Sequence, residues 1–170
     1  MVTGTMSLKF DTLPQSVDDI KASAYGSLSE PEYTAGLFVA AMMMYEKDKD
    51  LAFEMVNFLK GPEPLNNFKI SFINDRLEKG AKFYKIRSYF EGSSPDNDYT
   101  PEMPYTTVPI IRREDTFENE GWARVFMKST GADTEREVRL RLKKSTRQWF
   151  LNEEYLLPDI RVPKSADPWT

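Results

Sequence analysis

The spacing of apolar positions changes along this chain, from near 3.6 residues in the first half to two residues in the second. The first spacing predicts amphipathic helices, and the second predicts strands with one buried face. The clearest helix follows a capping-box sequence at residues 29–32, with Pro31 in its first turn. Its apolar stripe comprises Tyr33, Leu37, Phe38, Ala41, Met44 and Tyr45.

Three other helices are predicted from capping and breaking residues. A short helix opens at Ser16 and reaches about Tyr25. Another begins near Asp50 and stops at Gly61, which prolines follow. A further helix covers about residues 65–78. The short links between these segments indicate a compact helical layer.

Four strands are predicted in the second half, at residues 104–112, 121–128, 137–143 and 148–154. In the third, apolar Val138, Leu140 and Leu142 alternate with basic residues. Short connections between the later strands indicate an antiparallel meander. The predicted fold class is therefore α+β, with three or four N-terminal helices packed on a C-terminal antiparallel sheet of about four strands.

One domain accounts for the whole chain, because 170 residues are enough for one core and no internal repeat is visible. We expect residues 1–15 to form a flexible N-terminal segment. Residues 16–170 are then a single α+β domain. From about residue 156 its chain is expected to continue as an extended tail that apolar side chains fasten to the domain.

Charge and hydropathy narrow the classes of partner. The net charge of −4 gives no electrostatic footprint for nucleic acid, so no nucleic-acid partner is expected. The longest apolar stretch is about half the length of a membrane span, so no membrane partner is expected. We expect a cytoplasmic location, unless a leader or anchor has been removed. A small molecule or another protein stays possible as partner, and the oligomeric state is left open.

The residue types of common catalytic sites are missing. The chain has no histidine and no cysteine, and its eight glycines form no phosphate-binding motif. The acidic loop at residues 96–98 lacks the glycine and glutamate of a calcium loop. We therefore assign no catalytic residue, no metal ion and no cofactor, and the sequence favours a protein without catalytic activity.

Aromatic residues interleaved with arginine are the candidate ligand-binding residues. Most of them lie beside or within a long polar loop at residues 92–104, and such a set can line a groove for a small molecule or peptide. The same residue types also serve ordinary core packing. The candidates are Tyr84, Arg87, Tyr89, Tyr99 and Trp122.

Four segments resemble a family of small bacterial proteins, a domain of unknown function found largely in Gram-positive anaerobes. The segments are residues 32–41, 57–62, 87–92 and the ending at 167–169. The resemblance spans about residues 15–169. It implies a free-standing bacterial domain, and no catalytic residue carries over because the motifs have no assigned chemistry.

The leading hypothesis is a non-catalytic module of bacterial origin that binds a ligand or a protein. One alternative is a small pocket enzyme on a nuclear-transport-factor-like α+β fold, using carboxylate, Tyr and Arg groups. Another is a homo-oligomeric structural subunit. An enzyme requires a deep pocket with at least two titratable groups of perturbed pKa. A binding module requires a groove with aromatic walls and few buried charges.

Overall fold

The computed structural model describes residues 3–101 and 106–169. This part of the chain contains five α-helices and one five-stranded antiparallel sheet, which confirms the α+β class. The helices are α1 (Val17–Ala22), α2 (Pro31–Met42), α3 (Lys49–Lys60), α4 (Asn67–Arg76) and α5 (Tyr84–Arg87). The strands are β1 (Gly4–Phe10), β2 (Thr106–Arg112), β3 (Trp122–Met127), β4 (Arg136–Lys143) and β5 (Gln148–Glu154).

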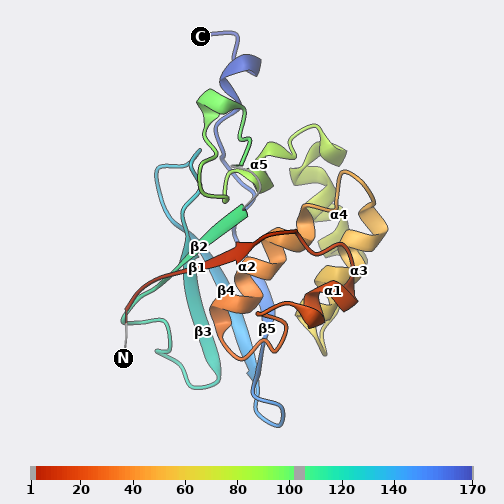
Figure 1. The fold of residues 1–170 in the computed structure, drawn as a ribbon, viewed down its shortest axis with the longest axis vertical. Coiled ribbons are helices and arrows are strands. Elements are labelled where there is room, and N and C mark those ends of the chain that lie inside the picture. The colour runs from red at the N-terminus through yellow and green to blue at the C-terminus, as the bar shows by residue number, and fades with distance from the viewer. Residues whose placement is uncertain (1–2, 102–105, 170) are drawn as a thin grey trace.

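The sheet is a meander in the order β1-β2-β3-β4-β5 (Figure 1), with five strands rather than about four. The additional strand is β1, within the segment for which the sequence predicted flexibility. It pairs with β2 along its whole length, from Gly4 opposite Arg112 to Phe10 opposite Thr106. Residues 104 and 105, where the next predicted strand begins, lie outside the described residues.

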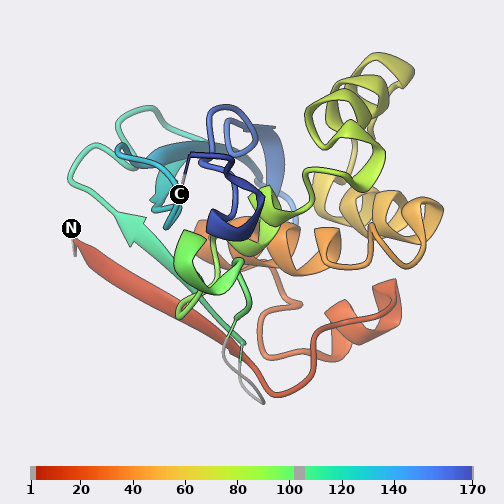
Figure 2. The ribbon, with the colours of Figure 1, turned by 90° about the horizontal axis from the view of Figure 1, so that it is seen from above.

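Helix α2 forms the centre of the core. It contacts all five strands, and Figure 2 shows it alongside the sheet. Eleven of its residues are buried, so the helix is enclosed on all sides rather than along one stripe. The buried Thr34 hydroxyl donates to the carbonyl oxygen of Trp149 at 2.5 Å. A Cβ at Gly36 would overlap with Leu8, so this glycine allows β1 to approach the helix.

The other helices pack around α2 rather than across the whole sheet. Helix α3 contacts α2 and the edge strand β5, and α1 contacts α3. Side-chain oxygens of Ser16, Asp48 and Asn66 accept backbone N–H groups at the starts of α1, α3 and α4. Helix α2 has Glu30 at its N-cap without a side-chain cap, in place of the predicted capping box. Because Asp48 is the N-cap of α3, that helix begins at Lys49, slightly before the predicted Asp50.

The chain beyond β5 packs back onto the domain. Leu156, Leu157 and Ile160 are buried, and the Arg161 N–H donates to the Gly131 carbonyl oxygen at 2.9 Å. Apolar side chains and a backbone hydrogen bond therefore hold residues 156–161 against the domain. Among the described residues, no helix is long and apolar enough to cross a membrane.

A buried ion pair joins the start of α2 to β2. The Arg112 guanidinium donates to Glu32 at 2.6 Å and to Glu30 at 3.0 Å, and it lies 4.8 Å from the centroid of the Phe117 ring. Only 2% of the Glu32 side chain is exposed, against 43% for Glu30. Glu32 is therefore the buried partner of Arg112, and Glu30 is a solvated one.

Replacing Glu32 with alanine should lower the free energy of unfolding by about 2–4 kcal/mol, because it leaves a half-buried guanidinium without its closest partner. Glu30→Ala is the matched control and should cost less than about 1 kcal/mol, because that carboxylate is solvated. Urea denaturation of the two variants measures both effects. Equal losses would show that burial of the pair does not matter.

Candidate functional site

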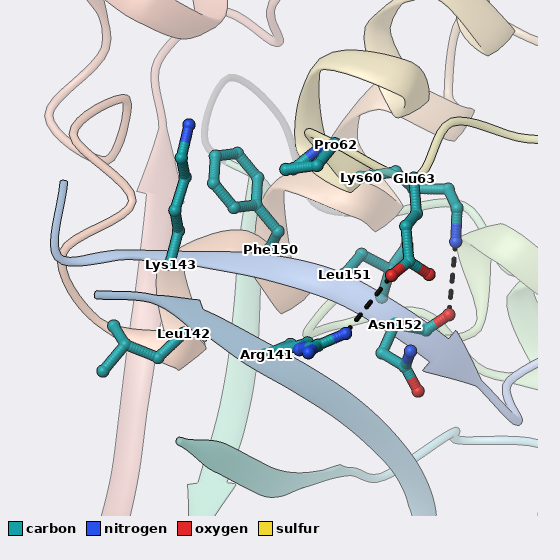
Figure 3. A pocket seen from close by; sticks show the side chains of 9 residues that line it. All are labelled: Lys60, Pro62, Glu63, Arg141, Leu142, Lys143, Phe150, Leu151 and Asn152. Atoms are coloured by element: carbon teal, nitrogen blue, oxygen red, sulfur yellow. Dashed lines mark hydrogen bonds and ion pairs between the residues drawn. The ribbon is translucent and has the colours of Figure 1, made fainter. Parts of the chain in front are cut away.

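A cavity of about 310 Å³ lies between the end of α3, the chain that follows it and the hairpin of β4 and β5 (Figure 3). Its apolar wall includes Phe150, Pro62 and Leu151. Charged side chains stand around this wall, and Figure 3 shows Lys60 and Glu63 on one side and Arg141 on the other. The full lining is Lys60, Pro62, Glu63, Arg141, Leu142, Lys143, Phe150, Leu151 and Asn152.

Gly61 shapes this cavity. It follows the last residue of α3 with φ 61°, a conformation that side chains disfavour, and so it ends the helix. The ring of Phe150 packs against its Cα, where any Cβ would overlap with the ring. Phe150 also pairs with Arg141 across the two strands. The glycine therefore lets the aromatic wall and the end of α3 meet closely.

Lys60 is the buried charged residue of the cavity, with 9% of its surface exposed. Its ammonium donates to the carbonyl oxygen of Asn152 at 3.2 Å, the dashed contact in Figure 3. Within the described residues it forms no other hydrogen bond and no ion pair. Burial lowers the pKa of Lys60, since desolvation disfavours the ammonium, although nearby Glu153 opposes this effect.

A second, smaller cavity of about 40 Å³ adjoins the first beneath α4. The two cavities share Lys60, Leu151 and Asn152 in their linings, so Lys60 stands between them. Lys69 on α4 pairs with Glu153 on β5 at 2.6 Å beside the smaller cavity. This ion pair links α4 to the edge of the sheet.

Glu154 lines the smaller cavity at the end of β5. The residue keeps some exposed surface, but protein atoms crowd its carboxyl group, and this desolvation raises its pKa to about 7. The N–H of Leu156 donates to the Glu154 carboxylate at 2.8 Å, and this hydrogen bond lowers the pKa. Other titratable groups around it are Glu153, Lys69, Lys60 and Tyr89.

Two of the residues predicted from sequence, Tyr84 and Tyr99, do lie together. Their rings stack with centroids 5.6 Å apart in a small cluster with Ala132 and Ile160. The Tyr99 hydroxyl donates to the carbonyl oxygen of Arg161 at 2.5 Å, and burial raises the pKa of Tyr99 to about 12. This stack therefore fastens the C-terminal chain to the domain.

The other three predicted residues lie in separate places. Arg87 pairs with Glu46 at 3.3 Å and, with Tyr84, lines an open hollow of about 360 Å³ beside the C-terminal chain. Tyr89 is buried in the main core, where burial raises its pKa and its hydroxyl donates to the Leu156 carbonyl oxygen. Trp122 is 37% exposed on β3, 5.1 Å from the guanidinium of Arg141 at the first cavity.

Sequence reasoning missed Lys60, Phe150 and Glu154. The one signal for Lys60 was its place in the segment at residues 57–62 that carries the family resemblance. A lysine at a helix end is otherwise unremarkable, because cations are favoured there. Phe150 and Glu154 had no local signal, since only the meeting of α3 with β5 brings them to the cavities.

Metal binding finds no support in the part of the chain that the structure describes. No group of three or more Asp, Glu, His or Cys side chains there could hold a metal ion. Of the carboxylates that line the cavities, Glu153 is paired with Lys69 and Glu63 with Arg141.

The sequence was compared with those of known protein families. The sequence model of a family described as "Domain of unknown function (DUF6935)" matches residues 12–164. The chain belongs to this family. The DUF6935 match starts after β1 and includes every residue that lines the two cavities. No curated protein and no solved structure matches the chain.

The raised pKa of Glu154 predicts a measurable pH effect. Between about pH 4.5, the ordinary pKa of this group, and about pH 7, the Glu154 carboxyl is ionised in the unfolded chain and protonated in the folded protein. Stability from this group is therefore full below about pH 4.5 and is lost as the pH rises through 7. Glu154→Gln should remove the loss and gain roughly 1–3 kcal/mol at about pH 8 relative to about pH 5.

Denaturant unfolding of parent and variant at both pH values measures this gain. Glu153→Gln is the comparison variant. It keeps the Glu154 carboxyl group and removes a neighbouring charge that adds less to the raised pKa of Glu154 than desolvation does, so its gain should be smaller. An E154Q variant whose stability difference from the parent is the same at both pH values would rule out the proposed ionisation.

Proposed function

We propose that this protein is a small-molecule binding module of bacterial origin, acting in the cytoplasm, with its ligand site at the joined cavities between α3, β4 and β5. The observation that carries the proposal is an apolar, partly aromatic wall beside Lys60, a lysine that is buried as a residue. Ligand sites typically combine a mainly apolar surface with a few fixed polar groups, in cavities from about 300 Å³ upward.

The hollow beside Tyr84 and Arg87 is the weaker candidate. It is more open, and its two cations are matched by surface carboxylates, Arg87 by Glu46 and Lys82 by Glu78. No buried charge faces it in the way that Lys60 faces the first cavity. Its Tyr84–Tyr99 stack already has a structural role in holding the C-terminal chain.

Titration of the ¹⁵N-labelled protein with a panel of soluble aromatic and aliphatic fragments tests the site by two-dimensional NMR. We expect saturable shifts concentrated at Lys60, Leu142, Phe150 and Asn152. Phe150→Ala should weaken the responding fragments about tenfold, because it removes the aromatic wall. Arg87→Ala is the control and should leave their affinity unchanged.

Shifts that gather at Tyr84 and Arg87 instead would move the site to the other hollow. If no fragment gave a saturable shift anywhere, the binding-module proposal would be contradicted.

Catalysis is the second candidate function, because two groups with perturbed pKa values, Lys60 and Glu154, line the adjoining cavities. A lysine whose pKa burial has lowered supplies the neutral amine that attacks carbonyl compounds. The nitrogen then forms an imine with the carbonyl carbon and water leaves. A carboxyl group that titrates near neutral pH is suited to proton transfer in such a reaction.

Reductive trapping tests this second candidate. The protein is incubated near pH 7 with benzaldehyde and sodium cyanoborohydride, which reduces any imine to a stable amine, and labelled lysines are mapped by mass spectrometry. Lys60 should react several-fold faster than Lys144, whose side chain is 75% exposed. Labelling that follows exposure alone, with Lys144 ahead of Lys60, would reject amine catalysis.

A further inference from the structure

The hydrogen bonding of Lys60 points to the chemistry of the ligand. An ammonium has three N–H donors, and the described residues offer it one acceptor, the Asn152 carbonyl oxygen. A lysine that is nine-tenths buried, as Lys60 is, usually forms an ion pair with a carboxylate. Because it lines both cavities, its remaining donors are available to a group that enters them.

The carboxylates near Lys60 do not fill this role. Glu153 is held by Lys69 at 2.6 Å, and Glu63 is held by Arg141 at 3.3 Å. The crowded Glu154 carboxyl is partly protonated at neutral pH, since its pKa is about 7. Each nearby carboxylate is therefore paired with another cation or partly protonated. The site keeps an excess of positive charge, from Lys60 and from Lys143 in the cavity lining.

The ion pair at the mouth of the cavity is exchangeable. Arg141 and Glu63 have 58% and 68% of their side chains exposed, and solvated pairs of this kind contribute little stability. Figure 3 shows the pair reaching from the chain after α3 to β4, with Asn152 close by. A ligand on its way to Lys60 can therefore separate this pair at small cost.

We propose that the ligand of this site is an amphipathic monocarboxylate, with its carboxylate on the Lys60 ammonium and its apolar body against Phe150, Pro62 and Leu151. The inference rests on the proposed binding function and adds the class of ligand. The apolar wall alone would accept an alcohol, an amine or an acid of the same skeleton. The buried cation selects the acid, because a charge-assisted hydrogen bond is stronger than a neutral one.

Three compounds with one skeleton test this selection: 4-phenylbutyrate, 4-phenylbutan-1-ol and 4-phenylbutylamine. Their affinities are measured by NMR titration for the parent protein and for Lys60→Met, Lys60→Arg and Lys144→Met. We expect the carboxylate to bind the parent about tenfold or more tightly than the other two. Lys60→Met should abolish the preference and Lys60→Arg should keep it. Lys144→Met removes an exposed charge outside the cavity lining and should change nothing.

The outcomes separate this inference from the binding function itself. Equal affinity for the alcohol or the amine at Phe150, or a preference for the acid that survives Lys60→Met, would overturn the carboxylate assignment while the binding function stands. The carboxylate assignment would also be overturned, and the binding function would stand, if other fragments bound at the site and none of the three compounds did. Absence of binding by every fragment at this cavity would overturn the function as well.

Discussion

The enclosure of helix α2 by the sheet and the other helices is the constraint on which this structure depends. With eleven residues buried, the helix cannot exist in water without cover on every side. Strands β1 to β5 supply one part of that cover, and α3 supplies another. Polar groups on the helix must then find partners inside the protein, as Thr34 does with Trp149 and Glu32 does with Arg112.

The position of α2 also explains where the candidate site forms. Because α2 lies against all five strands, α3 is displaced to the edge of the sheet, where it packs against β5. The end of a helix and the edge of a twisted sheet do not match closely in shape, and Gly61 brings them together at one point, the Phe150 ring. Both cavities form near this junction, and Lys60 lines both of them.

The elements whose periodicity was strong were predictable from sequence. The alternation of Val138 and Leu140 with Arg139 and Arg141 gave strand β4 and its buried face, and β5 was located at its observed limits. Strand β1 was missed, because seven residues with only Leu8 and Phe10 buried look like a polar terminus until β2 pairs with them. Pro109 lacks an N–H group for strand pairing, and it lies on β2, where the pairing with β3 is reduced to Ile111–Phe126.

The candidate site was less predictable for a physical reason. Aromatic residues attract attention in a sequence, yet Tyr89 and Tyr99 use their hydroxyl groups to hold the backbone at residues 156 and 161. Lysine and glutamate are ordinary surface residues, and what distinguishes Lys60 and Glu154 is a desolvation that only the packed structure produces. Such desolvation opposes folding. A ligand that gives the Lys60 ammonium a counter-charge would offset part of that cost, so binding and stability are linked at this residue.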